Sequence, residues 1–307
     1  MEVACGQCLG CRLDYSRMWA MRIVHESTLH EYDGGNCFVT LTYRDALECS
    51  VEQMESRSYI PDDWSLNKGH FKRFMKRLRK AFPENKIRYF YVGEYGRKCK
   101  HGLDLGLVPC PLCRVGRPHY HACLFNISFQ DLEAYQSDGG IMRYTSPTLE
   151  KLWGYGFVDV GELNYSSANY TAKYILKKIG GIHKEDHYMC LDEYGVVTFL
   201  LPEYVGMSRG NATSKGKKCG IGAGWLERYK SDVFPSDEVP VPGHGVMKGV
   251  PRYYDEILRE EDPKMYEEVK RMRIEFLKAH SDEFTPDRLL SKHKCKLARA
   301  KLKERKL

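Results

Sequence analysis

A histidine pair in the run Arg117-Pro-His-Tyr-His-Ala-Cys-Leu-Phe-Asn126 constrains the fold of this chain more than any other feature. Aromatic and apolar residues of this kind favour an extended strand, on which successive side chains alternate between two faces. His119 and His121 then project together, while Tyr120 points the other way. The pattern predicts a strand over residues 118–126 with two imidazoles placed to hold one metal ion. A surface histidine pair on a strand is the simpler alternative.

Two tyrosines follow in Asn169-Tyr-Thr-Ala-Lys-Tyr-Ile-Leu-Lys-Lys178. We predict a helix over residues 165–179, ended by Gly180-Gly181, on which Tyr170 and Tyr174 lie one turn apart with roughly 6 Å between their Cβ atoms. They would then be near-equivalent neighbours that can serve as two interchangeable nucleophiles. Aromatic core contacts of an amphipathic helix would give the same spacing.

Strand and helix patterns surround these two motifs. Residues 132–153 read as mixed helix and loop, interrupted at Gly139-Gly140. Elsewhere we predict strands over 37–43, 86–94 and 156–160, and helices over 12–32, 66–82, 263–280 and from the N-cap Thr285 onward. The histidine strand therefore follows two strands and precedes the tyrosine helix.

In this order the chain resembles the HUH superfamily of single-strand nickases. Phe38-Val-Thr-Leu-Thr42 matches the first motif, His119-Tyr120-His121 the second, and Tyr170-x-x-Lys173-Tyr174 the third. Further runs resemble the replication initiators of gokushovirus-type Microviridae, which are small single-stranded DNA phages. These runs are Cys5-Gly-Gln-Cys8-Leu-Gly-Cys11-Arg12, Val92-Gly-Glu94-Tyr-Gly96, Arg117-Pro-His-Tyr-His121 and Pro251-Arg-Tyr-Tyr-Asp255.

The resemblance implies an α+β fold with a central antiparallel sheet flanked by helices. It also implies that Glu94 joins His119 and His121 in holding Mg²⁺ or Mn²⁺, which suit an acidic ligand. A solvated carboxylate at a strand end is the alternative for Glu94. Tyr170 or Tyr174 would attack the scissile phosphate, and Lys173 and the metal would stabilise the charge that develops on the phenol oxygen.

The activity implied is rolling-circle initiation. The viral strand is nicked at the origin through a 5′-phosphotyrosine, a 3′-hydroxyl primer is left, and the displaced strand is rejoined into a circle. The partners implied are single-stranded or supercoiled phage origin DNA and the host helicase and DNA polymerase. A plasmid initiator or relaxase is the nearest relative class, but the cysteine and Pro-Arg-Tyr-Tyr runs favour a phage protein. A zinc-containing DNA-binding protein without catalysis is the alternative from another class.

Twelve cysteines in a chain with no recognisable export signal are more consistent with metal ligands or free thiols than with disulfides. Cys99-Lys-His101 and Cys110-Pro-Leu-Cys113 lie in an insertion over about 97–116, where relatives have a shorter turn. We predict a small structural Zn²⁺ knuckle there, with free thiols on a loop as the alternative. Three further cysteines could complete a site with Cys110 and Cys113, hold a separate ion, or do neither. They are Cys5, Cys8 and Cys11, which we expect the first helix to hold against the core.

Two basic stretches are candidates for contact with DNA phosphates. The net charge is 48 − 41 = +7, and residues 291–307 carry eight basic residues and one acid, which equals that whole excess. The helix over 66–82 has a basic face formed by Lys72, Arg73, Lys76, Arg77, Arg79 and Lys80. A solvated helix end and a soluble helix surface are the simpler interpretations of the two stretches.

Composition indicates a globular chain, with 42% hydrophobic and 29% charged residues. No apolar stretch reaches the roughly 20 residues of a membrane span, so we expect no membrane association and a place in the host bacterial cytoplasm. We predict an endonuclease core over 1–182 and, over 183–307, an accessory region that is first irregular and then helical with a basic end.

Overall fold

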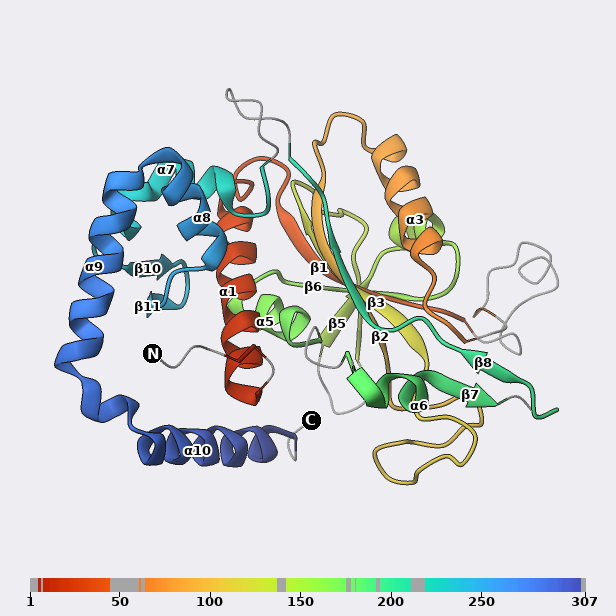
Figure 1. Cartoon of the computed structure of the whole chain (residues 1–307). Helices are drawn as coiled ribbons and strands as arrows, with labels where there is room; N and C mark the ends of the chain where they lie inside the picture. The colour runs from red at the N-terminus through yellow and green to blue at the C-terminus, as the bar shows by residue number, and fades with distance from the viewer. Residues whose placement is uncertain are drawn as a thin grey trace.

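The computed structural model describes residues 5–6, 8–44, 61, 64–136, 142–174, 178–179, 181–191, 194–210 and 219–304, with side chains up to residue 300. Its centre is an antiparallel sheet flanked by helices (Figure 1). This confirms the predicted α+β fold. None of the helices described is long and apolar enough to cross a membrane.

The central sheet has seven strands in the order β4-β5-β6-β1-β3-β2-β9. They are β1 (Asn36–Thr42), β2 (Arg88–Tyr95), β3 (Pro118–Phe125), β4 (Glu133–Gln136), β5 (Met142–Thr145), β6 (Val158–Gly161) and β9 (Tyr204–Met207). Strand β3 lies between β1 and β2, so that His119 is opposite Thr42 on one side and Glu94 on the other. This register brings the predicted metal ligands together on one face.

Helix α3 (Lys68–Ala81) covers one face of the sheet, together with α4 (Pro147–Trp153). Asn67 caps α3 by accepting a hydrogen bond from the Gly69 backbone amide. Phe71 of α3 stacks on Tyr91 with ring centroids 3.6 Å apart. Burial of side chains of this size contributes roughly 1.5–3 kcal/mol each, and it fixes the basic side of α3 toward solvent.

Helices α1 (Leu9–Thr28) and α5 (Tyr165–Lys173) pack against each other on the opposite face (Figure 1). Trp19 of α1 lies on Phe90 of β2, with ring centroids 4.8 Å apart. The tyrosine helix α5 is therefore on the same side of the sheet as His119, His121 and Glu94, while α3 is on the other side.

The C-terminal part adds two small sheets and a set of helices around α1. The sheets pair β7 (Met189–Leu191) with β8 (Val197–Phe199), and β10 (Glu238–Val241) with β11 (Gly245–Lys248). The helices are η3 (Gly181–His183), α6 (Lys184–Tyr188), α7 (Ala223–Val233), α8 (Arg252–Glu261), α9 (Pro263–Ala279), η4 (Ser281–Phe284) and α10 (Pro286–Glu304).

The Pro251-Arg-Tyr-Tyr-Asp255 run has a packing role at the start of α8. The buried Tyr254 hydroxyl is 2.8 Å from Nδ1 of His25 in α1. Tyr253 accepts a hydrogen bond from the Gly220 amide, and Asp255 binds the guanidinium of Arg273 in α9. The run thereby joins α1, α8 and α9.

Several element predictions need correction. Residues 132–153 contain the β4–β5 pair before α4, because these short, exposed strands form by pairing with β6 and leave no clear alternation in the sequence. The first helix ends at Thr28, before the predicted end at residue 32. The predicted breaks at Gly139-Gly140 and Gly180 lie outside the described residues. The predicted division at residue 182 stays a prediction, although β9 lies after it and pairs with β2.

Candidate metal and tyrosine site

Glu94, His119 and His121 form one cluster on the α5 face of the sheet. Oε1 of Glu94 is 2.6 Å from Nε2 of His119 and 3.0 Å from Nε2 of His121. Glu94 and His121 are buried, with 1% and 4% of their surface exposed, and His119 is half-buried. One carboxylate oxygen and two imidazole nitrogens within 4.8 Å of one another fit the ligand set of a divalent ion.

Hydrogen bonds orient both imidazoles from behind. Nδ1 of His119 is 3.2 Å from the Arg117 carbonyl, and Nδ1 of His121 is 2.9 Å from the Thr40 hydroxyl. A carbonyl only accepts, so Nδ1 of His119 carries the proton and Nε2 is left as the ligand atom. This is the arrangement by which proteins fix metal-binding histidines.

The two tyrosines of α5 lie directly beside His121. The ring of Tyr174 stacks on His121 with centroids 4.7 Å apart, and the Tyr170 ring meets His121 edge-on at 5.3 Å. The start of α5 is fixed by a capping box between Asn164 and Ser167. The structure thus brings the predicted tyrosines and histidines together.

The tyrosines are neighbours but not equivalent, which corrects the predicted near-equivalence. Tyr170 is 40% exposed, whereas Tyr174 is 9% exposed and occupies the C-cap position of α5. Burial raises the pKa of Tyr174 far above its usual value, and the negative charge of Glu94 adds to the effect. Burial also raises the pKa of Tyr170, while its hydrogen bond with Tyr174 opposes the increase. Both phenols are therefore protonated at neutral pH in this state.

Other predicted residues lie at different distances from this cluster. Lys173 is half-buried at the last helical position of α5. The cations predicted to bind DNA project from α3, on the far face of the sheet, and are Lys72, Arg73, Lys76, Arg77 and Lys80. Arg77 is committed to the fold, because it donates to the Trp153 carbonyl. The α3 cations thus do not line the metal cluster.

Sequence reasoning missed three polar residues on the site face. Thr40 lies inside the recognised first motif, and its alternation with Phe38 could have indicated its direction. Asp159 lies opposite Thr40 across β1 and β6, and Arg143 of β5 donates to it at 2.6 Å. The positive charge of Arg143 acts on the pKa of Tyr170 as a minor influence after burial and the Tyr174 hydrogen bond. No sequence pattern pointed to Arg143 or Asp159.

The predicted knuckle residues gather into one group. The four side chains Cys99, His101, Cys110 and Cys113 offer ligand atoms within 4.8 Å of one another, and the three thiols are buried. Nδ1 of His101 is 3.3 Å from Sγ of Cys110 and 3.4 Å from Sγ of Cys113. This Cys3His set matches the ligands of structural zinc sites.

Cys5, Cys8 and Cys11 form a separate group of their own, so the predicted alternative of a site shared with Cys110 and Cys113 is wrong. The expectation that α1 holds them against the core is also wrong, because Cys5 and Cys8 are exposed and Cys11 is only half-buried. They sit in the segment that enters α1, where Cys8 is the N-cap residue. Their neighbour is α10, as described below.

An antiparallel sheet with a His-x-His and carboxylate cluster, faced by two tyrosines of a neighbouring helix, defines a protein of the HUH type. The family model for replication-associated proteins of the ORF2 type matches residues 36–102 and 111–179. With the relatives that follow, this shows that the chain belongs to the family of phage replication-associated proteins and confirms the resemblance to those of gokushovirus-type Microviridae.

Three curated relatives carry the same description. Replication-associated protein ORF2 of Spiroplasma virus 4 is 32% identical over 266 residues, which cover 85% of this chain and 68% of the relative. Replication-associated protein VP4 of Bdellovibrio phage phiMH2K is 28% identical over 86% of this chain and 70% of its own length. Replication-associated protein ORF4 of Chlamydia phage 1 is 30% identical over 57% of this chain and 38% of its own length. No solved structure matches the chain.

Proposed function

We propose that this protein initiates rolling-circle replication of phage DNA by nicking the viral strand at the origin. The observation that supports the proposal is the contact of both tyrosine rings with His121, which belongs to the Glu94, His119 and His121 cluster. A nucleophile, ligands for a divalent ion and a half-exposed approach to the site then lie within a few ångströms of each other. The relatives act in phage replication by their descriptions, which fits this activity.

Glu94 and the Nε2 atoms of the two histidines would hold Mg²⁺ or Mn²⁺. Such an ion supplies charge neutralisation at the scissile phosphate. The phenol oxygen of Tyr170 or Tyr174 attacks phosphorus as its proton leaves, a new phosphorus–oxygen bond forms, and the bond to the 3′-oxygen breaks. The products are a 5′-phosphotyrosine and a strand whose 3′-oxygen has gained a proton. Lys173 would stabilise the negative charge that develops during attack.

The second tyrosine allows the cycle to close. After one round of synthesis it cuts the regenerated origin, and the 3′-hydroxyl of the displaced strand attacks the first phosphotyrosine to release a circle. The 3′-hydroxyl left by the first cut primes the host DNA polymerase, and a host helicase opens the duplex ahead of it. The site of action would be the host bacterial cytoplasm, on single-stranded or supercoiled origin DNA.

We also propose that the Cys99, His101, Cys110 and Cys113 group holds a structural Zn²⁺. Three buried thiols and one imidazole already lie at mutual distances that a single tetrahedral ion can span. The group lies in the insertion between the strands that carry Glu94 and His119. Zinc there would stabilise the ends of those strands.

The central test is covalent capture of an origin oligonucleotide in the presence of Mn²⁺, followed on a denaturing gel. Tyr170→Phe and Tyr174→Phe should each impair the full cut-and-join cycle, and the double variant should form no DNA-linked species. Tyr165→Phe is the matched control, because Tyr165 lies on the same helix but stacks on His244 away from the site. A DNA-linked species that persists in the double variant would refute the assignment of the nucleophiles.

Histidine variants separate cleavage from binding. His119→Ala and His121→Ala should abolish metal-dependent nicking and leave most non-specific DNA binding, because neither residue provides net positive charge to the proposed phosphate-binding surfaces. A wild-type chain that binds origin DNA but never cuts it would instead support the non-catalytic, zinc-containing DNA-binding protein.

A further inference from the structure

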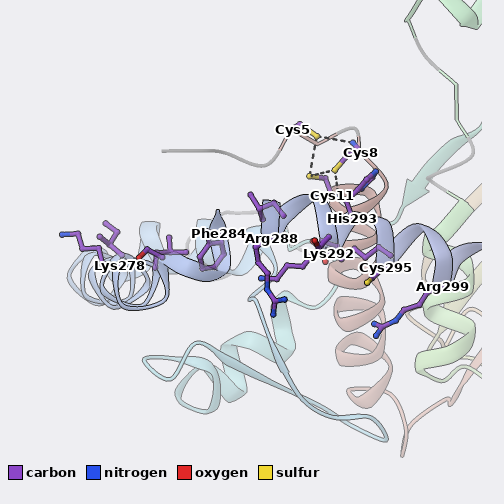
Figure 2. A pocket seen from close by; sticks show the side chains of 18 residues that line it. Cys5, Cys8, Cys11, Lys278, Phe284, Arg288, Lys292, His293, Cys295 and Arg299 are labelled. Carbon is purple, nitrogen blue, oxygen red and sulfur yellow. Dashed lines mark hydrogen bonds and ion pairs between the residues drawn. The ribbon is translucent and has the colours of Figure 1, made fainter. Parts of the chain in front are cut away.

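The three N-terminal cysteines face a cavity of about 1150 Å³ between the start of α1 and the last helices of the chain (Figure 2). Sγ of Cys11 is 3.5 Å from Sγ of Cys8 and 3.8 Å from Sγ of Cys5. The three sulfurs therefore converge on one point. Three thiols are one ligand short of the four that structural zinc sites use.

The backbone around these cysteines favours thiolates. The amide of Cys8 donates to Sγ of Cys5 at 3.3 Å, and the amide of Cys11 donates to Sγ of Cys8 at 3.5 Å. Cys8 is the N-cap of α1, so the positive end of the 20-residue helix dipole also points toward the group. Amide hydrogen bonds and a helix N-terminus both stabilise the deprotonated form, which is the form that binds metal.

Helix α10 presents a half-buried face to the same cavity. Lys292, His293 and Lys296 belong to this face and line the cavity. Cys295 also lines the cavity but is exposed. Figure 2 shows His293 on the cysteine side of α10, whereas the Cys295 thiol points away from the other three sulfurs. His293 is therefore the soft ligand of α10 best placed to reach them.

The charges of α10 match the group that would form. Three thiolates and one neutral imidazole around Zn²⁺ leave one net negative charge. Lys296 extends to the start of α1, where its Nζ is 3.7 Å from Asp14 and lies close to Gly10 and Cys8. A lysine ammonium beside the sulfurs would offset the residual negative charge and further favour the thiolates.

We propose that Cys5, Cys8 and Cys11, together with His293, bind a second Zn²⁺ that fastens α10 to the start of α1. The site is distinct from the knuckle and from the nicking site, and it does not rest on the proposed function. Its consequence is mechanical, because the basic residues of α10 would be held to the helix that packs along the tyrosine helix α5. Zinc loading would then fix where the C-terminal positive charge lies.

Zinc stoichiometry of the full chain, purified without chelator and measured by mass spectrometry of the metal, tests the ligand set. We expect about two Zn²⁺ per chain, and about one after His293→Ala or Cys8→Ser. Cys295→Ser is the matched control on the same helix and should keep about two, while Cys99→Ser with Cys110→Ser should keep about one. His293→Cys should restore the lost ion, because a fourth thiolate can replace the imidazole.

Two results would overturn the proposal at this stage. One is an unchanged stoichiometry in His293→Ala, which would mean that α10 supplies no ligand. The other is iron with visible absorption in place of zinc. Substitution by Co²⁺ provides an independent readout, since loss of His293 should alter the visible bands of a three-thiolate site while Cys295→Ser should not.

Hydrogen exchange of residues 286–300 tests the fastening of α10. His293→Ala should speed exchange in this helix by about tenfold or more, because local opening would no longer require release of the metal. Cys295→Ser should leave exchange as in the wild type. Equal exchange in both variants would show that no ion joins α10 to α1. Covalent DNA capture, measured on the same samples, reports separately on the nicking site.

Discussion

Among the individual side chains, one carboxylate oxygen organises the site. Glu94 Oε1 meets Nε2 of both His119 and His121, and each imidazole is held from behind by a hydrogen bond at Nδ1. The ring orientations are thus set by the Arg117 carbonyl and by Thr40. Thr40 is the one side chain among these supports that can be changed without altering the backbone.

Thr40→Val removes the hydroxyl that contacts Nδ1 of His121 and nearly preserves the side-chain volume. We expect about a tenfold to hundredfold loss of Mn²⁺ affinity, the usual effect of losing such a partner of a metal ligand. Titration of Mn²⁺ into the DNA-free protein measures it. Thr42→Val is the control, since Thr42 lies on the same strand and face, opposite His119, with no described side-chain hydrogen bond to either histidine. Equal affinity in both variants would remove the positioning role of Thr40.

Among the strands and helices, the cysteine insertion continues the pairing of β2 and β3 beyond the site. The Gly96 amide donates to the Arg117 carbonyl at 2.8 Å, and the Arg117 amide donates to the Lys98 carbonyl at 2.8 Å. Gly116 is needed there, because a Cβ would collide with the Gly96 carbonyl. The knuckle ligands begin at Cys99, so they tie together the strand ends that carry Glu94 and His119.

Cys110→Ser should therefore weaken the nicking site from a distance. We expect loss of the knuckle zinc and, because the β2 and β3 ends are freed, a several-fold loss of Mn²⁺ affinity at Glu94 and His119. Zinc analysis and Mn²⁺ titration of the same preparation provide the two measurements. Leu107→Ser is the matched control, because Leu107 lies in the insertion and is 77% exposed. Full Mn²⁺ affinity in a zinc-depleted Cys110→Ser protein would contradict the coupling.

The contact of α1 with α8 and β10 carries a pH dependence through His25. This side chain is fully buried, and burial lowers its pKa to about 4, although its hydrogen bond to the Pro240 carbonyl acts in the opposite direction. Since the folded-state pKa lies below the ordinary value of about 6.5, the neutral form is favoured by folding. The resulting stability is complete above about pH 6.5 and is lost as the pH falls through 4.

Thermal unfolding between pH 4 and pH 7 measures this effect. The wild type should lose up to about 3 kcal/mol from protonation of His25 alone over that interval, whereas His25→Gln should lose less, whatever its stability at pH 7. Comparison of the two slopes cancels the titration of other groups. Parallel slopes would show that His25 does not control the acid sensitivity of this contact.

Across the molecule, the sheet separates two positively charged surfaces. The cations of α3 lie on one side, and Arg143, the metal cluster and the tyrosines lie on the other. A short strand that fills only the nicking site would contact Arg143 but could not reach α3 through the sheet. A longer DNA could pass around the edge and contact both.

The salt dependence of DNA affinity distinguishes the two surfaces, since each lost phosphate contact reduces the slope by about 0.7 for single strands. For an oligonucleotide just long enough to fill the site, Arg143→Gln should reduce the slope, and joint replacement of Lys72, Lys76 and Lys80 by Gln should not. For long origin DNA the triple variant should also reduce it. An effect of the triple variant on the short oligonucleotide would contradict this placement.

The local features of this protein follow from the order of its amino acids alone. Strand alternation placed His119 and His121 on one face, helical spacing brought Tyr170 and Tyr174 within one turn, and cysteine spacing marked the knuckle. Apolar periodicity likewise predicted α3, α9 and most of α10. These features depend on residues close together in the chain, where backbone geometry fixes which side chains are neighbours.

Features that depend on contacts between distant segments became visible only in the folded chain. The β4–β5 pair and β9 owe their place to pairing with other strands, and Arg143 reached the site face through that pairing. Burial against His121 made Tyr174 different from Tyr170, and packing of α10 across α1 brought His293 toward three cysteines nearly the whole chain away. Spacing in a sequence carries no information about such approaches, because they arise from how the faces of the folded elements pack together.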